Sequence, residues 1–530
     1  MVAAGWPGQP RKSLEGSTMS AKKSKKAAIK KNGRRVVKKA LETSQNEDRL
    51  SRLDKSIIAM PLLDQLKGAT AADSFDIIID LNLLYRGGLE NAKEHSIKLI
   101  DKIVKSQQTS SRGVAREKSK LAFQYIFAQL TKAEIINMVE SDAAQSGPGN
   151  PPAIYKIWPD FEVEAHLTKS VSTVKADAAR VAFSAVGKDI CWAVIDTGID
   201  GKHPHFKIHD NLNLSEYAPI KHLDFTSELF RELDKPEDNN GHGTHVAGII
   251  AGEGSKDRLN AVTRQRDEAG DYTYLIHSLN AISGVAPKCK LLSLKVLDNQ
   301  GKGRVSNLIA ALGYIHQLNG YGRWNRIQGV NMSVGYGFDA EWFACGQSPL
   351  CVEVDRLVRS GVVEVVAAGN TGYGWLQTSS EGPFKTGLDL SINDPGNAEL
   401  AITVGATHRE MPHIYGVSYF SSKGPTGDGR LKPDLVAPGE KIISCAAGEK
   451  RDKVSEKVDG QFDYREESGT SMAAPHVSGA IAAFLSIRRE YIGQPAQVKE
   501  IFLSTATDLN RERYFQGRGL VDLMRALQSV

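Results

Sequence analysis

Cysteine is scarce in this chain, and no two cysteines have the Cys-x-x-Cys spacing. The 530 residues contain five, namely Cys191, Cys289, Cys345, Cys351 and Cys445. An odd number of cysteines without a Cys-x-x-Cys pair indicates neither a dense disulfide framework nor a zinc knuckle. Cys345 and Cys351 are near enough in sequence to form a disulfide. In a reducing compartment, however, we expect mostly free thiols.

Long hydrophobic runs are also lacking. No stretch approaches the roughly 18 consecutive apolar residues that a membrane-spanning helix needs. The N-terminal region has no apolar core of the kind found in secretory signals. We therefore expect no membrane span and a cytoplasmic location. Hydrophobic residues make up 41% of the chain and charged residues 24%, which is typical of globular proteins.

Positive charge is concentrated at the N-terminus. Residues 1–50 carry 13 Lys and Arg against 4 Asp and Glu, a net charge of +9 in a chain whose total is +5, which leaves −4 for the rest. Such a segment cannot bury enough apolar surface to fold, so residues 1–55 are predicted to be a disordered basic tail. Binding of nucleic acid, a membrane surface or an acidic partner is the weaker alternative. Met19 is an alternative start, which would make residues 1–18 an upstream artefact.

Two folded domains are predicted after this tail, because the chain is longer than one core usually supports. Residues 56–170 alternate short apolar runs with helical patterns, which indicates a small α+β domain. Residues 171–530 contain near-continuous apolar strands, each followed by Gly-rich turns and Ala/Gly-rich helices. This pattern predicts an α/β domain with a mostly parallel central sheet and helices on both faces.

Polar residues follow the buried strands of the second domain, where sites of parallel sheets form. Asp196 ends one apolar run, His242 lies in a Gly-rich segment, and Ser471 begins a predicted helix. A hydroxyl, an imidazole and a carboxylate are the groups that acyl transfer requires. Taken singly, each has an ordinary structural explanation: Asp as a turn cap, His as a core residue, Ser as a helix N-cap.

The segments around these residues carry a family resemblance. They include VIDTGID, GHGTHVAG, GVAP, NMSVG, AAGN, FSSKGPTGDGRLKPDLVAPG and GTSMAAPHVSG, in that order. The sequence from about 175 to 530 thereby resembles the subtilase family of serine endopeptidases. The resemblance implies a catalytic triad of Asp196, His242 and Ser471, and Asn370 as the side-chain donor of the oxyanion hole.

The resemblance also implies where a peptide substrate would bind. The segments are Asn299–Gly303, with Gly301, Lys302 and Gly303 as the assigned residues, then Ser333, Val334 and Gly335, and Ala367, Ala368 and Gly369. The chain departs from the family at about 253–282, 371–392 and 447–466, which leaves the substrate preference and any metal ligands unassigned. No cofactor is expected for the chemistry, and structural calcium stays open.

The first domain resembles the family's propeptide in pattern and position. This implies a self-inhibited precursor, with its own N-terminal domain as inhibitor, that cleaves itself near residues 160–172. Two rival hypotheses are a scaffold that acts mainly by binding and a nucleic-acid-binding protein that uses the basic tail. A metal site at His242 and His245 is disfavoured, because their spacing of three residues lacks the glutamate of a His-Glu-x-x-His helix. His245 and His476 are interpreted as structural.

Overall fold

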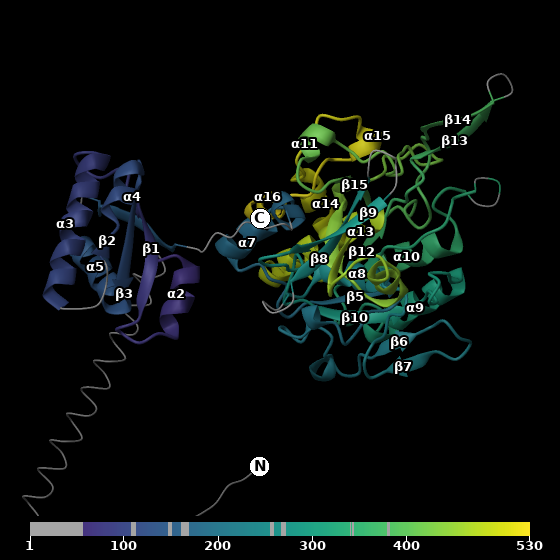
Figure 1. The fold of residues 1–530 in the computed structure, drawn as a ribbon, viewed down its shortest axis with the longest axis horizontal. Helices are drawn as coiled ribbons and strands as arrows, with labels where there is room; N and C mark the ends of the chain where they lie inside the picture. Colours follow the sequence, from purple (N-terminus) through teal and green to yellow (C-terminus); the bar gives the residue numbers. More distant parts are fainter. Residues whose placement is uncertain are drawn as a thin grey trace, which may run out of the picture. The chain divides into compact units, whose positions relative to one another are not determined.

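The chain divides into two compact units, residues 1–162 and 163–530 (Figure 1). The computed structural model describes residues 57–107, 113–146, 151–160, 169–254, 259–266, 272–339, 341, 344–378 and 382–530. The predicted basic tail, residues 1–55, lies outside the described residues, as does most of the predicted cleavage segment.

The first unit is a four-stranded antiparallel sheet with helices packed against it. The strand order is β2-β3-β1-β4. The strands are β1 (Ser74–Leu81), β2 (Gly113–Val114), β3 (Tyr125–Thr131) and β4 (Ile154–Pro159), and the helices are α2 (Met60–Lys67), α3 (Leu89–Gln107), α4 (Arg116–Leu121) and α5 (Lys132–Ala144). Ile77, Ile79 and Leu81 alternate along β1 into the core. The predicted α+β layer is therefore present.

The second unit is built on an eight-stranded sheet of order β16-β15-β12-β11-β5-β10-β6-β7. All neighbouring pairs are parallel except β6 with β7 at one edge. The strands are β5 (Cys191–Asp196), β6 (His222–Asp224), β7 (Arg231–Leu233), β10 (Lys290–Lys295), β11 (Gly329–Met332), β12 (Val363–Ala367), β15 (Ile402–His408) and β16 (Leu435–Glu440).

Helices cover both faces of this sheet, as the alternation of side chains along β5 requires. Trp192 and Val194 point into the core shared with α8 (His242–Ile250) and α13 (Thr470–Ile487). Ala193 and Ile195 point into the opposite core, shared with α9 (Val305–Leu318) and α10 (Pro349–Arg359). The predicted α/β architecture with a mostly parallel sheet is confirmed.

The second unit also contains two smaller sheets and several further helices. Residues from two of the segments that depart from the family join in one small sheet of order β17-β18-β8-β9, and a free-standing hairpin β13-β14 extends outward in Figure 1. These strands are β8 (Asn260–Arg266), β9 (Tyr272–Ser278), β13 (Tyr373–Thr378), β14 (Gly382–Gly387), β17 (Ile442–Cys445) and β18 (Tyr464–Glu467). The other helices are α6 (Lys169–Thr173), α7 (Ala176–Phe183), α11 (Pro412–Tyr415), α12 (Gly448–Ser455), α14 (Pro495–Ser504), α15 (Arg513–Gln516) and α16 (Leu523–Gln528).

Helix α13 runs through the centre of the second unit. Within the described residues it is the one helix long and apolar enough to cross a membrane, and 83% of that apolar stretch is buried inside the protein. It contacts β11, β12, β15 and β16 as well as α8. Its apolar composition is therefore explained by its place in the core.

Glu364 is an unusual residue for the middle of this sheet. It lies on β12 between the core residues Val363 and Val365, so its side chain faces the layer that contains α10. Neither carboxyl oxygen meets a hydrogen-bond partner among the described residues. Burial, helped by the charge of Asp355, raises the pKa of Glu364 well above its usual range. These surroundings favour the neutral, protonated form of the Glu364 carboxyl in the folded protein.

We expect Glu364→Gln to stabilise the protein increasingly as the pH rises. The folded state retains a proton that the unfolded chain releases above the usual glutamate pKa. For each pH unit between the unfolded and the folded pKa, the free energy of unfolding of the wild type falls by up to about 1.4 kcal/mol. Glu364→Gln does not titrate and loses none of this stability. Urea unfolding near pH 4 should show little difference between the two proteins, and a clear gain at neutral pH. Glu399→Gln, an exposed site, is the control, and equal gains at every pH would contradict the prediction.

Candidate active site

Asp196 and His242 meet where β5 ends and α8 begins. Asp196 is the last residue of β5 and is buried, and His242 is the first residue of α8. The Nδ1 atom of His242 lies 2.7 Å from Oδ1 of Asp196. Gly243 makes this approach feasible, because a Cβ atom there would lie 2.2 Å from the carbonyl oxygen of Gly198 and 3.1 Å from Cβ of Asp196. Any larger residue would push α8 away from the strand.

Asp238 holds the loop before α8 against the end of β5. It is buried, and its carboxylate accepts five hydrogen bonds of 2.6–3.0 Å, from Thr197 Oγ1, the N–H groups of Asn240, Gly241 and Thr244, and Thr244 Oγ1. Thr197 Oγ1 in turn accepts the N–H of Gly243 at 2.9 Å. Asp238 and Thr197 were not predicted as site residues. The one sequence signal for Asp238 is a carboxylate shortly before a helix, where free N–H groups need acceptors.

The environment of His242 favours its protonated form. Burial alone lowers the pKa of an imidazole, but the charge of Asp196 and its hydrogen bond outweigh burial and raise the pKa of His242 above its usual value. Lys450 acts in the lowering direction and Glu467 in the raising direction. Because Nδ1 faces the carboxylate, the other ring nitrogen, Nε2, is the one available to the cleft.

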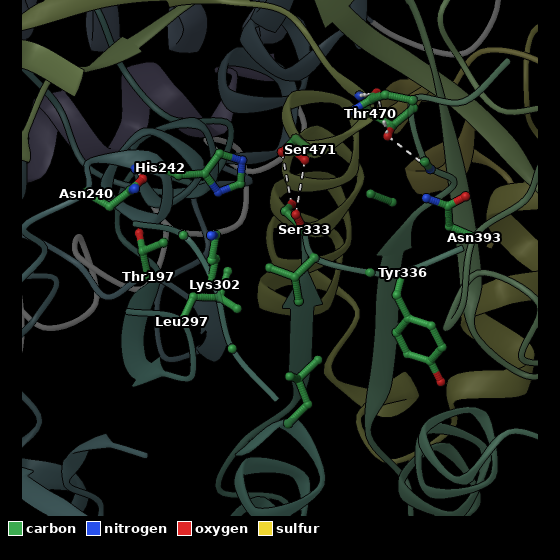
Figure 2. A pocket seen from close by; sticks show the side chains of 18 of the residues that line it. Thr197, Asn240, His242, Leu297, Lys302, Ser333, Tyr336, Asn393, Thr470 and Ser471 are labelled. Carbon is green, nitrogen blue, oxygen red and sulfur yellow. Dashed lines mark hydrogen bonds between the residues drawn. The ribbon is translucent and has the colours of Figure 1, made fainter. Parts of the chain in front are cut away.

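Ser471 lies at the start of α13, opposite His242 in Figure 2. Its Oγ donates a hydrogen bond to the carbonyl oxygen of Ser333 at 3.0 Å, and Oγ of Ser333 donates to the carbonyl of Ser471 at 2.9 Å. This reciprocal pair fixes the first turn of α13 to the end of β11. The turn also supplies free N–H groups and the positive end of the helix dipole beside the hydroxyl.

The side-chain amide of Asn370 has a defined orientation. Its Oδ1 accepts hydrogen bonds from the backbone N–H of Thr470 at 2.9 Å and from Oγ1 of Thr470 at 3.1 Å. Only an oxygen can accept the backbone N–H, so the NH₂ group is the end that remains for other partners. Asn370 and Ser471 both line the same cleft. The amide can therefore donate to an oxygen atom bound beside Ser471.

This cleft has a volume of about 830 Å³. Eight of the nine predicted substrate-binding residues line it, namely Gly301, Lys302, Gly303, Ser333, Val334, Gly335, Ala367 and Gly369. Ala368 does not line the cleft, because it is completely buried behind the wall. Gln300, which lies in the predicted segment Asn299–Gly303, also lines it. So do residues that were not predicted, namely Thr197, Asn240, Leu297, Arg304, Val305, Leu308, Tyr336, Thr371, Asn393, Lys450 and Thr470.

Two histidines near the site have structural contacts. Nε2 of His245 lies 3.1 Å from the carbonyl oxygen of Arg465, and Nδ1 of His476 lies 2.8 Å from that of Met472. Burial lowers the pKa of each to about 4, so both are neutral near pH 7. No group of three His, Cys, Asp or Glu side chains able to hold a metal occurs within the described ranges. All five cysteines are free thiols, as predicted.

Comparison with known proteins gives a consistent set of relatives. The sequence model of the subtilase family matches residues 187–519. The chain is 30% identical to serine protease AprX of Bacillus subtilis (strain 168) over 360 residues, which are 67% of this chain and 70% of that protein. It is 28% identical to subtilisin E of the same strain over 358 residues, 68% and 70% of the two chains. It is also similar to the major intracellular serine protease of that strain, with 31% identity over 317 residues, 60% and 74% of the two chains.

The contact between Asp196 and His242 predicts a measurable shift in the imidazole titration. In Asp196→Asn the raising influence of the carboxylate is lost while burial remains, so the pKa of His242 should fall by at least about one unit. Histidine labelled with ¹³C at Cε1 reports the midpoint by NMR, and His242→Gln identifies the signal. Asp298→Asn should leave the midpoint in place. An unchanged or higher midpoint in Asp196→Asn would show that the carboxylate does not control this imidazole.

Proposed function

The chain belongs to the subtilase family and is a serine endopeptidase, and we propose that Asp196, His242 and Ser471 are its catalytic triad. The observation that carries this proposal is the 2.7 Å contact of His242 with Asp196 at the edge of the cleft that Ser471 and Asn370 also line. In the first step Ser471 Oγ exchanges its bond to the Ser333 carbonyl for one to Nε2 of His242. It then attacks the scissile carbonyl carbon of the substrate.

His242 acts as base and then as acid. Nε2 takes the Ser471 proton as the new C–O bond forms, and the resulting imidazolium is stabilised by Asp196. Collapse of the tetrahedral intermediate breaks the C–N bond, and Nε2 gives the proton to the leaving amine. A water molecule then repeats the sequence on the acyl-enzyme, which releases the new carboxylate and restores Ser471.

Asn370 and the backbone N–H of Ser471 are the proposed oxyanion donors. Because Thr470 engages Oδ1 of Asn370, the amide presents its NH₂ group without reorganising during the reaction. Donors fixed in advance stabilise the developing negative charge more than donors that must first turn. All the groups that this mechanism needs come from the chain itself, so the proposed chemistry needs no cofactor.

Ser471→Ala provides the direct test of the nucleophile. The variant should lose turnover by a factor of about 10⁶, the magnitude known for subtilisin's own serine rather than one derived from this structure. Hydrolysis of casein and labelling by a fluorophosphonate measure the effect, and circular dichroism establishes that the variant is folded. Ser478→Ala, further along α13, should still be labelled. A labelled, active Ser471→Ala protein would remove Ser471 from the mechanism.

We further propose that the chain is made as a self-inhibited precursor. The N-terminal unit would block the cleft until the chain is cut near residues 160–172. This proposal is supported by the division of the chain into separate compact units after Glu162, inside that range. It is also supported by the α+β fold of the first unit, which can form its own core.

Intact-mass analysis of freshly purified protein tests self-cleavage. The wild type should yield two fragments, produced by a cut at a bond between residues 160 and 172. Ser471→Ala should keep its full mass. Adding active wild type to Ser471→Ala shows whether the cut also occurs between molecules. A fully active wild type of uncut mass would refute the precursor hypothesis while leaving the triad in place.

A further inference from the structure

The charges that line the active-site cleft are all of one sign. Its lining residues include Lys302, Arg304 and Lys450, and no aspartate or glutamate is present among the described residues that form the wall. Outside the basic tail the chain as a whole is slightly acidic. The positive charge is therefore a local property of the cleft rather than a general property of the second unit.

Lys302 and Arg304 form one part of this charge. Both are exposed, and neither forms an ion pair in the part of the chain that the structure describes. Figure 2 shows Lys302 on the same side of the cleft as His242, across from Tyr336 and Asn393. The nearby Asp298 uses Oδ1 to accept the N–H groups of Gln300 and Lys302 in its own turn. Asp298 and Glu228 line a neighbouring hollow that Lys302 and Arg304 also line, and neither carboxylate lines the cleft itself.

Lys450 supplies the charge beside His242. Its Nζ lies 3.0 Å from Oε2 of Glu467, while Arg465 lies 2.8 Å from Oε1 of the same carboxylate. Burial would raise the pKa of Glu467, but the surrounding His245, Arg465 and Lys450 hold it at about 2, so the carboxylate is ionised. With His245 neutral near pH 7, two cations share one anion. The group keeps one excess positive charge, and Lys450 is the member that lines the cleft.

We propose that this cleft selects peptides with acidic side chains on both sides of the scissile bond, an inference that rests on the proposed function. Lys302 lies in the predicted substrate-binding segment and Arg304 follows it, and both line the cleft. As part of the proposal, we assign these two cations to the acyl side of the substrate. Lys450 lies near His242, which returns the proton to the leaving amine, so it serves the other side. Carboxylates placed near these cations gain electrostatic attraction, which salt screens because Lys302 and Arg304 are exposed.

The chain's own sequence contains a peptide of this kind. The range predicted for self-cleavage begins with Asp160, Glu162 and Glu164, which are three carboxylates within five residues. This charge is complementary to Lys302, Arg304 and Lys450. The segment that the enzyme is proposed to cut first therefore has the composition that its cleft favours.

Matched quenched fluorescent peptides test the selectivity. One peptide spans residues 158–172, and its partner carries D160N, E162Q and E164Q. A second pair of peptides has one common sequence except at the second residue after the cleaved bond, which is Glu in one peptide and Gln in the other. At low ionic strength kcat/KM should be roughly three- to ten-fold higher for each acidic peptide, as expected for a few partly exposed charge pairs, and the ratio should shrink towards one at high salt.

Charge-neutral variants assign the effect to its residues. The double variant K302Q/R304Q should lower the acidic-to-neutral ratio for the first pair of peptides, and K450Q should lower it for the second. Lys207→Gln is the matched control, because Lys207 is exposed and lines a different hollow. Its ratios should equal those of the wild type.

The outcomes separate this inference from the proposed function. A wild-type ratio of one with normal cleavage and fluorophosphonate labelling of Ser471 would overturn the selectivity and leave the triad intact. A ratio above one that survives in both K302Q/R304Q and K450Q would overturn the assignment to these residues. Absence of both cleavage and labelling in the processed protein would overturn the proposed function and the inference with it.

Discussion

The close approach of α8 to the end of β5 is the constraint on which the site depends. Asp196 and His242 can meet at 2.7 Å only because Gly243 leaves room between the helix and the strand. Asp238 and Thr197 then link the same loop to the same strand by hydrogen bonds between buried groups. Satisfying these groups within the loop fixes the backbone around the imidazole, since a buried acceptor without donors is costly. The geometry of Asp196 and His242 is thus a consequence of packing at one edge of the sheet.

Much of this arrangement could be predicted from the sequence, for a physical reason. Near-continuous apolar strands identify a parallel sheet, and parallel strands place Asp196, Ser333 and Ala367 at the same edge. The family motifs then identify which polar residues to examine there. Ala368 was the exception among the predicted cleft residues. Its motif gave its position along the chain but not the direction of its side chain, which is buried behind the wall.

Residues whose position depends on irregular segments could not be predicted in this way. Lys450 lies in a segment that departs from the family, and nothing in its local sequence indicates that α12 returns it to the cleft. In the sequence, residues 253–282 and 447–466 are two separate segments that depart from the family pattern. The structure joins them, because β18 pairs with β8 through Tyr464 with Ala261 and Arg465 with Val262. Long-range pairing of this kind leaves no short-range periodicity to read.

This pairing connects the variable part of the chain to its chemistry. The small sheet fixes β18, which carries Arg465 and Glu467 and ends a few residues before Ser471. Glu467 pairs with Lys450 and with Arg465, and so holds Lys450 near His242. Lys450 and Glu467 act on the pKa of His242 in opposite directions. A substrate carboxylate beside Lys450 would offset its cationic charge and make the imidazole a stronger base while that substrate is bound. Selectivity for charge and the basicity of His242 would then be two effects of one ion pair, whose lysine lies in a segment where this chain differs from its family.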